Sequence, residues 1–167
     1  TGLNRIRLVN DYAAMSRGVA ELSDEHFRIL HEGRVLDQTA PVLVAGPGTG
    51  LGMATLLRTA AGKWRVLTGQ GGHAMFAPQT DREWALKKQL EKTYGYVSNE
   101  LVLSGAGLDA VHKALCELDD KTWVQTPPAV IMQNAHDGDT VSHEICEIRS
   151  NATMGALGDA ALVNGTQ

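Results

Sequence analysis

Apolar residues in the first part of the chain occur in short runs separated by polar or glycine-rich stretches, the pattern of strands joined by turns. This pattern predicts short strands over residues 5–9, 23–38, 42–45, 53–59 and 64–67. Turn residues at Glu32-Gly33 and at Ala60–Lys63 interrupt this strand-rich part. The run Val42–Ala45 is entirely apolar and follows Pro41, so we expect a buried strand there.

Helical spacing begins directly after Asn10-Asp11. Four apolar residues recur there at intervals of three or four: Tyr12, Met15, Val19 and Leu22. This spacing places them on one face of a helix, which we expect to point inward. Asp11 then lies at or near the N-cap of that helix.

The second half of the chain is mainly helical in pattern. Thr80 and Glu83 form a capping box, which predicts a helix that continues to about Tyr94. Further helices are expected over Leu108–Leu118, from Pro127-Pro128 through Ile131, and from Asp139 or Thr140 onward with Val141, Ile145, Ile148 and Ala152 inward. Strands come first and helices follow, so the sequence predicts an α/β domain, with α+β as the alternative.

Composition and charge exclude several function classes. The 167 residues are 43% apolar and 20% charged, which fits one soluble globular domain. The net charge is -4 and no basic stripe is present, so we expect neither nucleic acid nor membrane as a partner. Cys116 and Cys146 lack the Cys-x-x-Cys spacing, and together with the missing secretory leader this favours a reducing cytoplasm.

Glycine is concentrated between Gly46 and Gly72, and the first part of this stretch is a candidate phosphate-binding turn. No Gly-Lys-Ser/Thr follows, so it is not a P-loop. A glycine turn between strands can still bring backbone N–H groups close to phosphate, with the Thr49 hydroxyl as a further donor. The alternative is a tight turn that binds nothing.

Two other groups of polar residues could carry chemistry. The Asp11 carboxylate could take a proton from a substrate hydroxyl that Asn10 orients, although both residues also suit a helix cap. Glycines flank Gln70 and His73, which leaves room for a polar ligand such as a sugar. The alternative for His73 is a structural histidine.

Taken together and in this order, these motifs resemble the bacterial glucokinase family of the hexokinase and actin-like superfamily. The matching segments are Leu8–Tyr12 with its Asn-Asp pair, Gly48–Gly52, Gln70–His73 continuing to Phe76-Ala77-Pro78, and Ser98–Gly105. The resemblance covers most of the chain. It implies an actin-like ATPase or ribonuclease H-like fold, here as the incomplete large domain of a sugar kinase.

The resemblance also implies the reaction and the role of each residue. The activity would be phosphorylation of glucose by ATP to glucose 6-phosphate, the first step of glycolysis, with Mg²⁺ carried by the nucleotide. Asp11 would be the catalytic base. The sugar hydroxyls would be bound by Asn10, Gln70, His73 and Glu100, and the ATP phosphates by Gly48, Thr49 and Gly50.

The chain departs from the family pattern in three respects. The family's N-terminal phosphate loop and its later glycine-rich adenosine motif are absent, and Gln70 stands where the family has Glu. We therefore expect residues 1–12 to be a hinge strand end and residues 13–167 a truncated large domain, inactive by itself. A non-catalytic sugar-binding or regulatory module is the alternative function, and a homodimer is an assembly that the resemblance allows.

Overall fold

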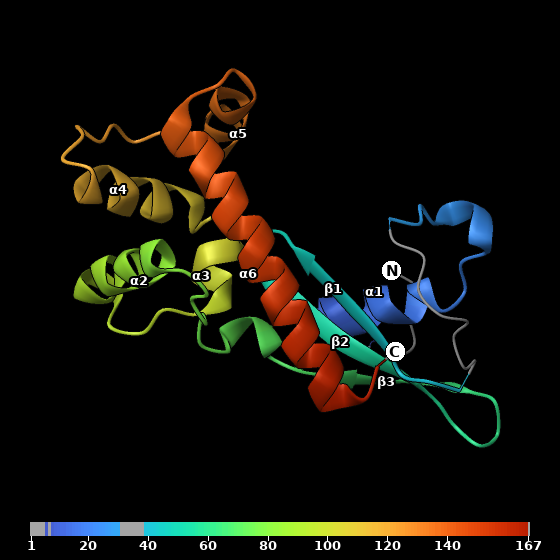
Figure 1. Ribbon diagram of the computed structural model, residues 1–167. Coiled ribbons are helices and arrows are strands. Elements are labelled where there is room, and N and C mark those ends of the chain that lie inside the picture. The colour runs from blue at the N-terminus through green and yellow to red at the C-terminus, as the bar shows by residue number, and fades with distance from the viewer. Residues whose placement is uncertain (1–5, 7, 31–38, 167) are drawn as a thin grey trace. The chain divides into compact units, whose positions relative to one another are not determined.

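The computed structural model describes residues 6, 8–30 and 39–166. They divide between two compact units, each described here by itself. The first unit contains the described residues of ranges 1–44, 53–69 and 161–167, and the second contains residues 45–52 and 70–160. The described residues form three strands and several helices, so the structure confirms a domain of mixed helix and sheet (Figure 1).

The sheet has the strand order β1-β2-β3, formed by Val42–Pro47, Leu51–Arg58 and Trp64–Thr68. β2 and β3 pair antiparallel, from Ala54 opposite Thr68 to Arg58 opposite Trp64. Gly62 has a φ of 74° in the connecting turn, a conformation that glycine adopts without strain. The predicted hairpin and its turn at Ala60–Lys63 are confirmed. β1 is also confirmed as a strand, but Val42 is exposed and the other residues of this strand are not fully buried.

Two strand predictions near the N-terminus are wrong where the structure describes the chain. Of residues 5–9, positions 6, 8 and 9 are described, and they form no strand and are exposed, with Leu8 at 95%. Residues 23–30 contain the short 3₁₀ helix η1 (Asp24–His26) and no strand. Residues 31–38, with the expected Glu32-Gly33 turn, lie outside the described residues. Apolar residues predict a strand only where a neighbouring strand can pair with them.

Helix α1 (Asp11–Val19) contacts β3 within the first unit, but its inward face differs from the prediction. Ser16 is fully buried, whereas Met15 and Leu22 are each 45% exposed. The prediction of inward residues from the apolar spacing is confirmed for Tyr12 and Val19, which are half-buried. It is wrong for Met15 and Leu22.

Five helices form most of the second unit. They are α2 (Asp81–Tyr94), α3 (Asn99–Leu103), α4 (Leu108–Leu118), α5 (Pro128–His136) and α6 (Thr140–Asn164), whose last residues belong to the first unit. Thr80 Oγ1 accepts a hydrogen bond from the Glu83 N–H at 3.2 Å, which confirms the predicted cap of α2. Asp139 Oδ2 likewise accepts from the Ser142 N–H at 2.8 Å at the start of α6. The predicted inward residues of α6 are all buried.

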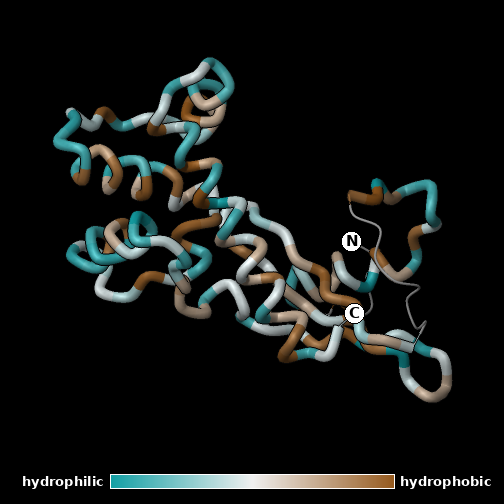
Figure 2. Tube along the Cα trace, viewed as in Figure 1, coloured by the Kyte–Doolittle hydropathy of each residue, from teal (hydrophilic) through white to brown (hydrophobic). Residues whose placement is uncertain are grey.

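Apolar side chains of α2, α3 and α4 form the core of the second unit, with hydrophobic residues recurring along each helix (Figure 2). The buried side chains include Leu86, Leu90, Val102, Val111 and Leu115. An ion-pair network joins three elements at the edge of this core. Arg82 binds Glu144 through two hydrogen bonds of 2.6 and 3.0 Å and Asp119 at 2.8 Å. In the described part of the chain, no helix is long and apolar enough to cross a membrane.

Candidate functional site

The predicted phosphate-binding turn, called the phosphate-side turn or glycine turn below, consists of Gly48, Thr49 and Gly50 and connects β1 to β2. A hydrogen bond within its own backbone closes it. The Gly48 N–H donates to the Gly50 carbonyl at 2.7 Å, and the turn's tip at Thr49 is exposed. The next N–H, of Leu51, donates to Glu100 Oε2 at 2.8 Å. Two of the turn's backbone donors are therefore already engaged, and Thr49 and Gly50 are the residues left at its tip.

Helix α3 positions Glu100, and the sequence analysis did not predict this helix. Ser98 caps it, since Oγ accepts from the Leu101 N–H at 3.1 Å, and Glu100 lies in its first turn. A serine followed by an acidic residue is a helix start signal that could have revealed it. The Asn99 N–H donates to the Ala74 carbonyl at 2.8 Å, so the same helix is joined to the segment that follows His73.

The glycine-rich segment before Ala74 folds as the 3₁₀ helix η2 (Gly71–His73) and packs directly on the turn. A Cβ atom at Gly72 would collide with the backbone carbonyl of Leu51, so only glycine permits this approach. His73 Nδ1 lies 3.9 Å from Glu100 Oε1, and these side chains are 60% and 31% exposed. The imidazole and the carboxylate therefore face one another where solvent, or a ligand, can reach both.

Gln70 precedes η2 and is exposed, and its side chain makes no capping hydrogen bond. It belongs to the same compact unit as His73, Glu100 and the glycine turn. The structure thus brings together three of the four segments on which the resemblance rests.

Asn10 and Asp11 belong to the first unit. Asn10 is the N-cap of α1, because Oδ1 accepts from the Ala13 N–H at 3.0 Å. Asp11 is the first helical residue, and its Oδ1 accepts from the N–H of Tyr12 at 2.8 Å. Burial of Tyr12, and then the nearby Asp11 charge, raise the pKa of the Tyr12 phenol. Since Asn10 provides the cap, the Asp11 carboxylate is not required for it.

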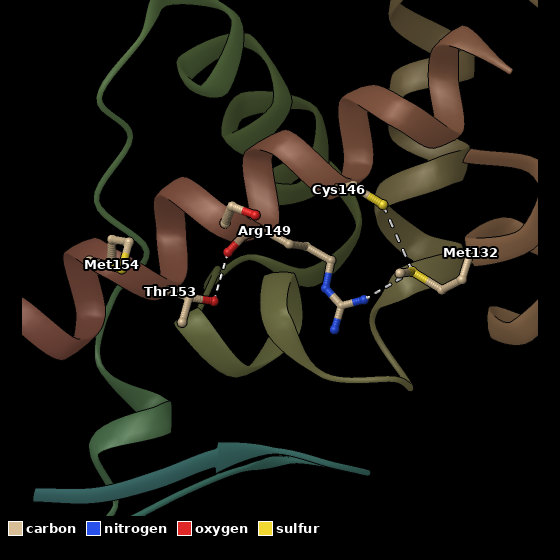
Figure 3. A pocket seen from close by; sticks show the side chains of 6 residues that line it. Met132, Cys146, Arg149, Thr153 and Met154 are labelled. Carbon is tan, nitrogen blue, oxygen red and sulfur yellow. Dashed lines mark hydrogen bonds between the residues drawn. The ribbon is translucent and has the colours of Figure 1, made fainter. Parts of the chain in front are cut away.

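A separate pocket of about 420 Å³ lies beside α6 in the second unit and was not predicted (Figure 3). Its lining includes Met132, Cys146, Arg149, Thr153 and Met154. The Arg149 guanidinium donates to the Leu103 carbonyl at 2.6 Å, and burial lowers its pKa. Leu103 is the last residue of α3, so this pocket residue supports the helix that carries Glu100.

The described residues contain no group of three or more His, Cys, Asp or Glu side chains that could hold a metal ion. What the second unit offers a ligand is a carboxylate, an imidazole, an amide and a glycine turn. Such groups bind hydroxyls and phosphates through hydrogen bonds.

Comparison with known proteins shows what this chain is similar to. A family model described as Glucokinase matches residues 1–167. The glucokinase of Chromobacterium violaceum is 35% identical over 167 residues, which are 99% of this chain and 47% of that protein. The glucokinase of Paramagnetospirillum magneticum is 37% identical over 168 residues, which cover 99% of this chain and 52% of that protein. The chain therefore spans about half the length of these relatives.

Solved structures agree with the sequence relatives. A crystal structure of a glucokinase from an Antarctic psychrotroph matches with a TM-score of 0.85 and 32% identity, over 95% of this chain and 49% of that one. The glucokinase of Balamuthia mandrillaris in complex with glucose matches with a TM-score of 0.72 and 24% identity, over 90% and 45% of the two chains. The second likeness shows the fold alone.

Proposed function

Because the chain belongs to the glucokinase family, we propose that the whole protein transfers a phosphoryl group from ATP to the 6-hydroxyl of glucose. The observation that carries the proposal is that Glu100 lies beside His73 and binds the N–H that follows the glycine turn, all within one compact unit. A sugar kinase needs a sugar site next to a phosphate site, since positioning provides much of the rate.

We assign the sugar hydroxyls to Asn10, Gln70, His73 and Glu100. Glu100 Oε2 is occupied by the Leu51 N–H, so Oε1, on the side of His73, is the oxygen that accepts from a hydroxyl. A hydrogen bond to a charged acceptor is worth roughly 1.5–3 kcal/mol, more than a bond between neutral groups. Glu100 is therefore the strongest single sugar ligand in the second unit.

We assign the catalytic base to Asp11. One carboxylate oxygen accepts from the backbone, and no ion-pair partner of Asp11 occurs among the residues that the structure describes. The second oxygen can accept the proton of the 6-hydroxyl as that oxygen attacks the terminal phosphorus of ATP. Removal of this proton makes the hydroxyl oxygen a better nucleophile.

We assign the ATP phosphates to the tip of the glycine turn, at Thr49 and Gly50. Gly48 contributes by its shape, because its own N–H closes the turn. Mg²⁺ would arrive with the nucleotide and neutralise charge on the phosphates. We place the domain in the actin-like, ribonuclease H-like class of sugar kinases, with residues 1–12 as the hinge strand end, and the protein in the cytoplasm.

Gln70 favours a second candidate, a sugar-binding module without turnover, because the family pattern has a carboxylate there. A coupled assay of glucose 6-phosphate formation by the whole protein, run beside calorimetric titration with glucose, distinguishes the two. ATP-dependent turnover supports the kinase, and glucose binding without turnover supports the module. Absence of both would overturn the proposed function.

A further inference from the structure

We propose that α3 couples the two substrate sites, with Glu100 as a sugar ligand through Oε1 and as the anchor of the phosphate-side turn through Oε2. This inference rests on the proposed function of the same site. It assigns to Glu100 a second, positioning role toward ATP, and it makes Gly50 a positioning residue for the sugar.

The turn is attached to the first turn of α3 and to the chain just after this helix. The Leu51 N–H donates to Glu100 Oε2 at 2.8 Å, and the N–H of Gly105, two residues after the end of α3, donates to the Gly48 carbonyl at 2.9 Å. Leu51 is 6% exposed, so water competes little for its N–H, the donor of the first of these bonds. A displacement of α3 or of the Glu100 side chain therefore displaces the turn.

Gly50 is in close contact with the same carboxylate. A Cβ atom at this position would lie 2.5 Å from Glu100 Oε2, closer than side chains tolerate. A Cβ atom at Gly48, in the same turn, would have no atom within 4 Å. The two glycines are thus matched in place and residue type, and only Gly50 requires glycine in order to keep Glu100 where it is.

Helix α3 is itself fixed, so it can transmit a change rather than absorb it. Arg149 binds the carbonyl of its last residue, Leu103, at 2.6 Å. A Cβ atom at Gly107 would collide with the Leu101 carbonyl, so the chain that leaves α3 packs directly against it. Val102 and Leu103 are buried.

Two substitutions of Glu100 in the whole protein separate its roles. In Glu100→Gln the amide oxygen can still accept from the Leu51 N–H, so we expect KM for glucose to rise about tenfold and KM for ATP to stay within about twofold. In Glu100→Ala both bonds are lost, and we expect KM for ATP to rise by about fivefold or more as well. An unchanged KM for ATP in Glu100→Ala would overturn the proposal.

A second pair tests the link from the opposite side. We expect Gly50→Ala to raise KM for glucose about tenfold. The control is Gly158→Ala in α6, outside the proposed site, where a Cβ atom would also meet no atom within 4 Å, and we expect it to leave KM for glucose within about twofold. Glu100→Asp shortens the side chain by one methylene and so withdraws the carboxylate from the position of the added Cβ atom. In a protein that carries Glu100→Asp, we therefore expect the further change Gly50→Ala to alter KM for glucose little. Equal KM values for glucose in Gly50→Ala and Gly158→Ala would contradict the link.

The controls separate this inference from the function on which it rests. Thermal unfolding of each variant shows whether it is folded, and if Gly50→Ala is not, the Glu100 pair still decides. If the unmodified protein neither binds nor phosphorylates glucose, the proposed function fails. The protein could instead do both, while every variant changes the KM for one substrate without changing the KM for the other. In that case the proposed function stands and only the coupling fails.

Discussion

At the residue scale, Asn10 and Asp11 have different tasks although they are adjacent. Asn10 caps α1, and Asp11 keeps one carboxylate oxygen available beyond its backbone bond. Replacement of Asn10 by Ala should therefore cost about 1 kcal/mol of stability, in addition to the sugar hydrogen bond that we assign to this residue. Replacement of Asp11 should affect the chemistry instead.

We expect Asp11→Asn in the whole protein to lower kcat by roughly 10²–10⁴-fold with KM for glucose nearly unchanged, because an amide cannot accept the proton. Steady-state kinetics with a thermal unfolding scan measure both effects. A variant that loses mainly thermal stability would show that Asp11 is a structural residue and that the base lies elsewhere.

Gln70 is the other residue where a single substitution is informative. Its side chain is exposed and makes no cap, so a carboxylate can be accommodated without loss of a structural contact. We expect Gln70→Glu to tighten glucose binding by about 1 kcal/mol, roughly fivefold, because a charged acceptor binds hydroxyls more strongly. Isothermal titration measures the change, and unchanged or weaker binding would show that Gln70 is not an impaired ligand.

At the element scale, capping signals and periodicity predicted α2, α4 and α6 and the β2-β3 hairpin. The residues that define those elements act locally, as Thr80 does for α2. The inward face of α1 was predicted wrongly, because packing against β3 selected Ser16 over the larger Met15. Helix α3 was missed because five residues are too few for periodicity to be visible.

The Arg82 network should make the stability of the second unit depend on pH. Burial raises the pKa of Asp119, but hydrogen bonds and charge from Arg82 and then Lys121 outweigh this, so the pKa is lower than usual. Its stabilisation is therefore complete above the unfolded pKa of about 4 and is lost as pH falls through the folded value. Asp119→Asn should unfold about 2–4 °C earlier at pH 7, and the difference should shrink as pH falls through the lowered pKa and vanish below it. A difference that persists in acid would contradict this.

Arg149 should stabilise α3 through its bond to the Leu103 carbonyl. We expect Arg149→Met, which keeps the apolar stem, to cost about 1–3 kcal/mol because it leaves a buried carbonyl without its partner. Chemical denaturation measures this loss. Lys113→Met is the matched control, since Lys113 is exposed, and an equal loss in both variants would contradict the role of Arg149.

At the scale of the whole molecule, the family could be identified from the order of four short motifs, and the comparison with known glucokinases confirms it. The physical reason for the motif spacing became visible only in the structure. Leu51 connects three motifs, because its N–H binds Glu100 and its carbonyl lies against Gly72. A contact between residues 49 positions apart leaves no local signal in the sequence.

Hydrogen exchange resolved to single amides, with and without glucose, tests most directly whether these motifs form the sugar site. In the whole protein, glucose should slow exchange at Leu51, within η2 and in the first turn of α3, because sugar bound to Glu100 and His73 holds these segments together. The Leu51 amide is the most specific reporter, since it donates to Glu100 Oε2. Protection confined to other parts of the molecule, or none while glucose is bound, would contradict the account.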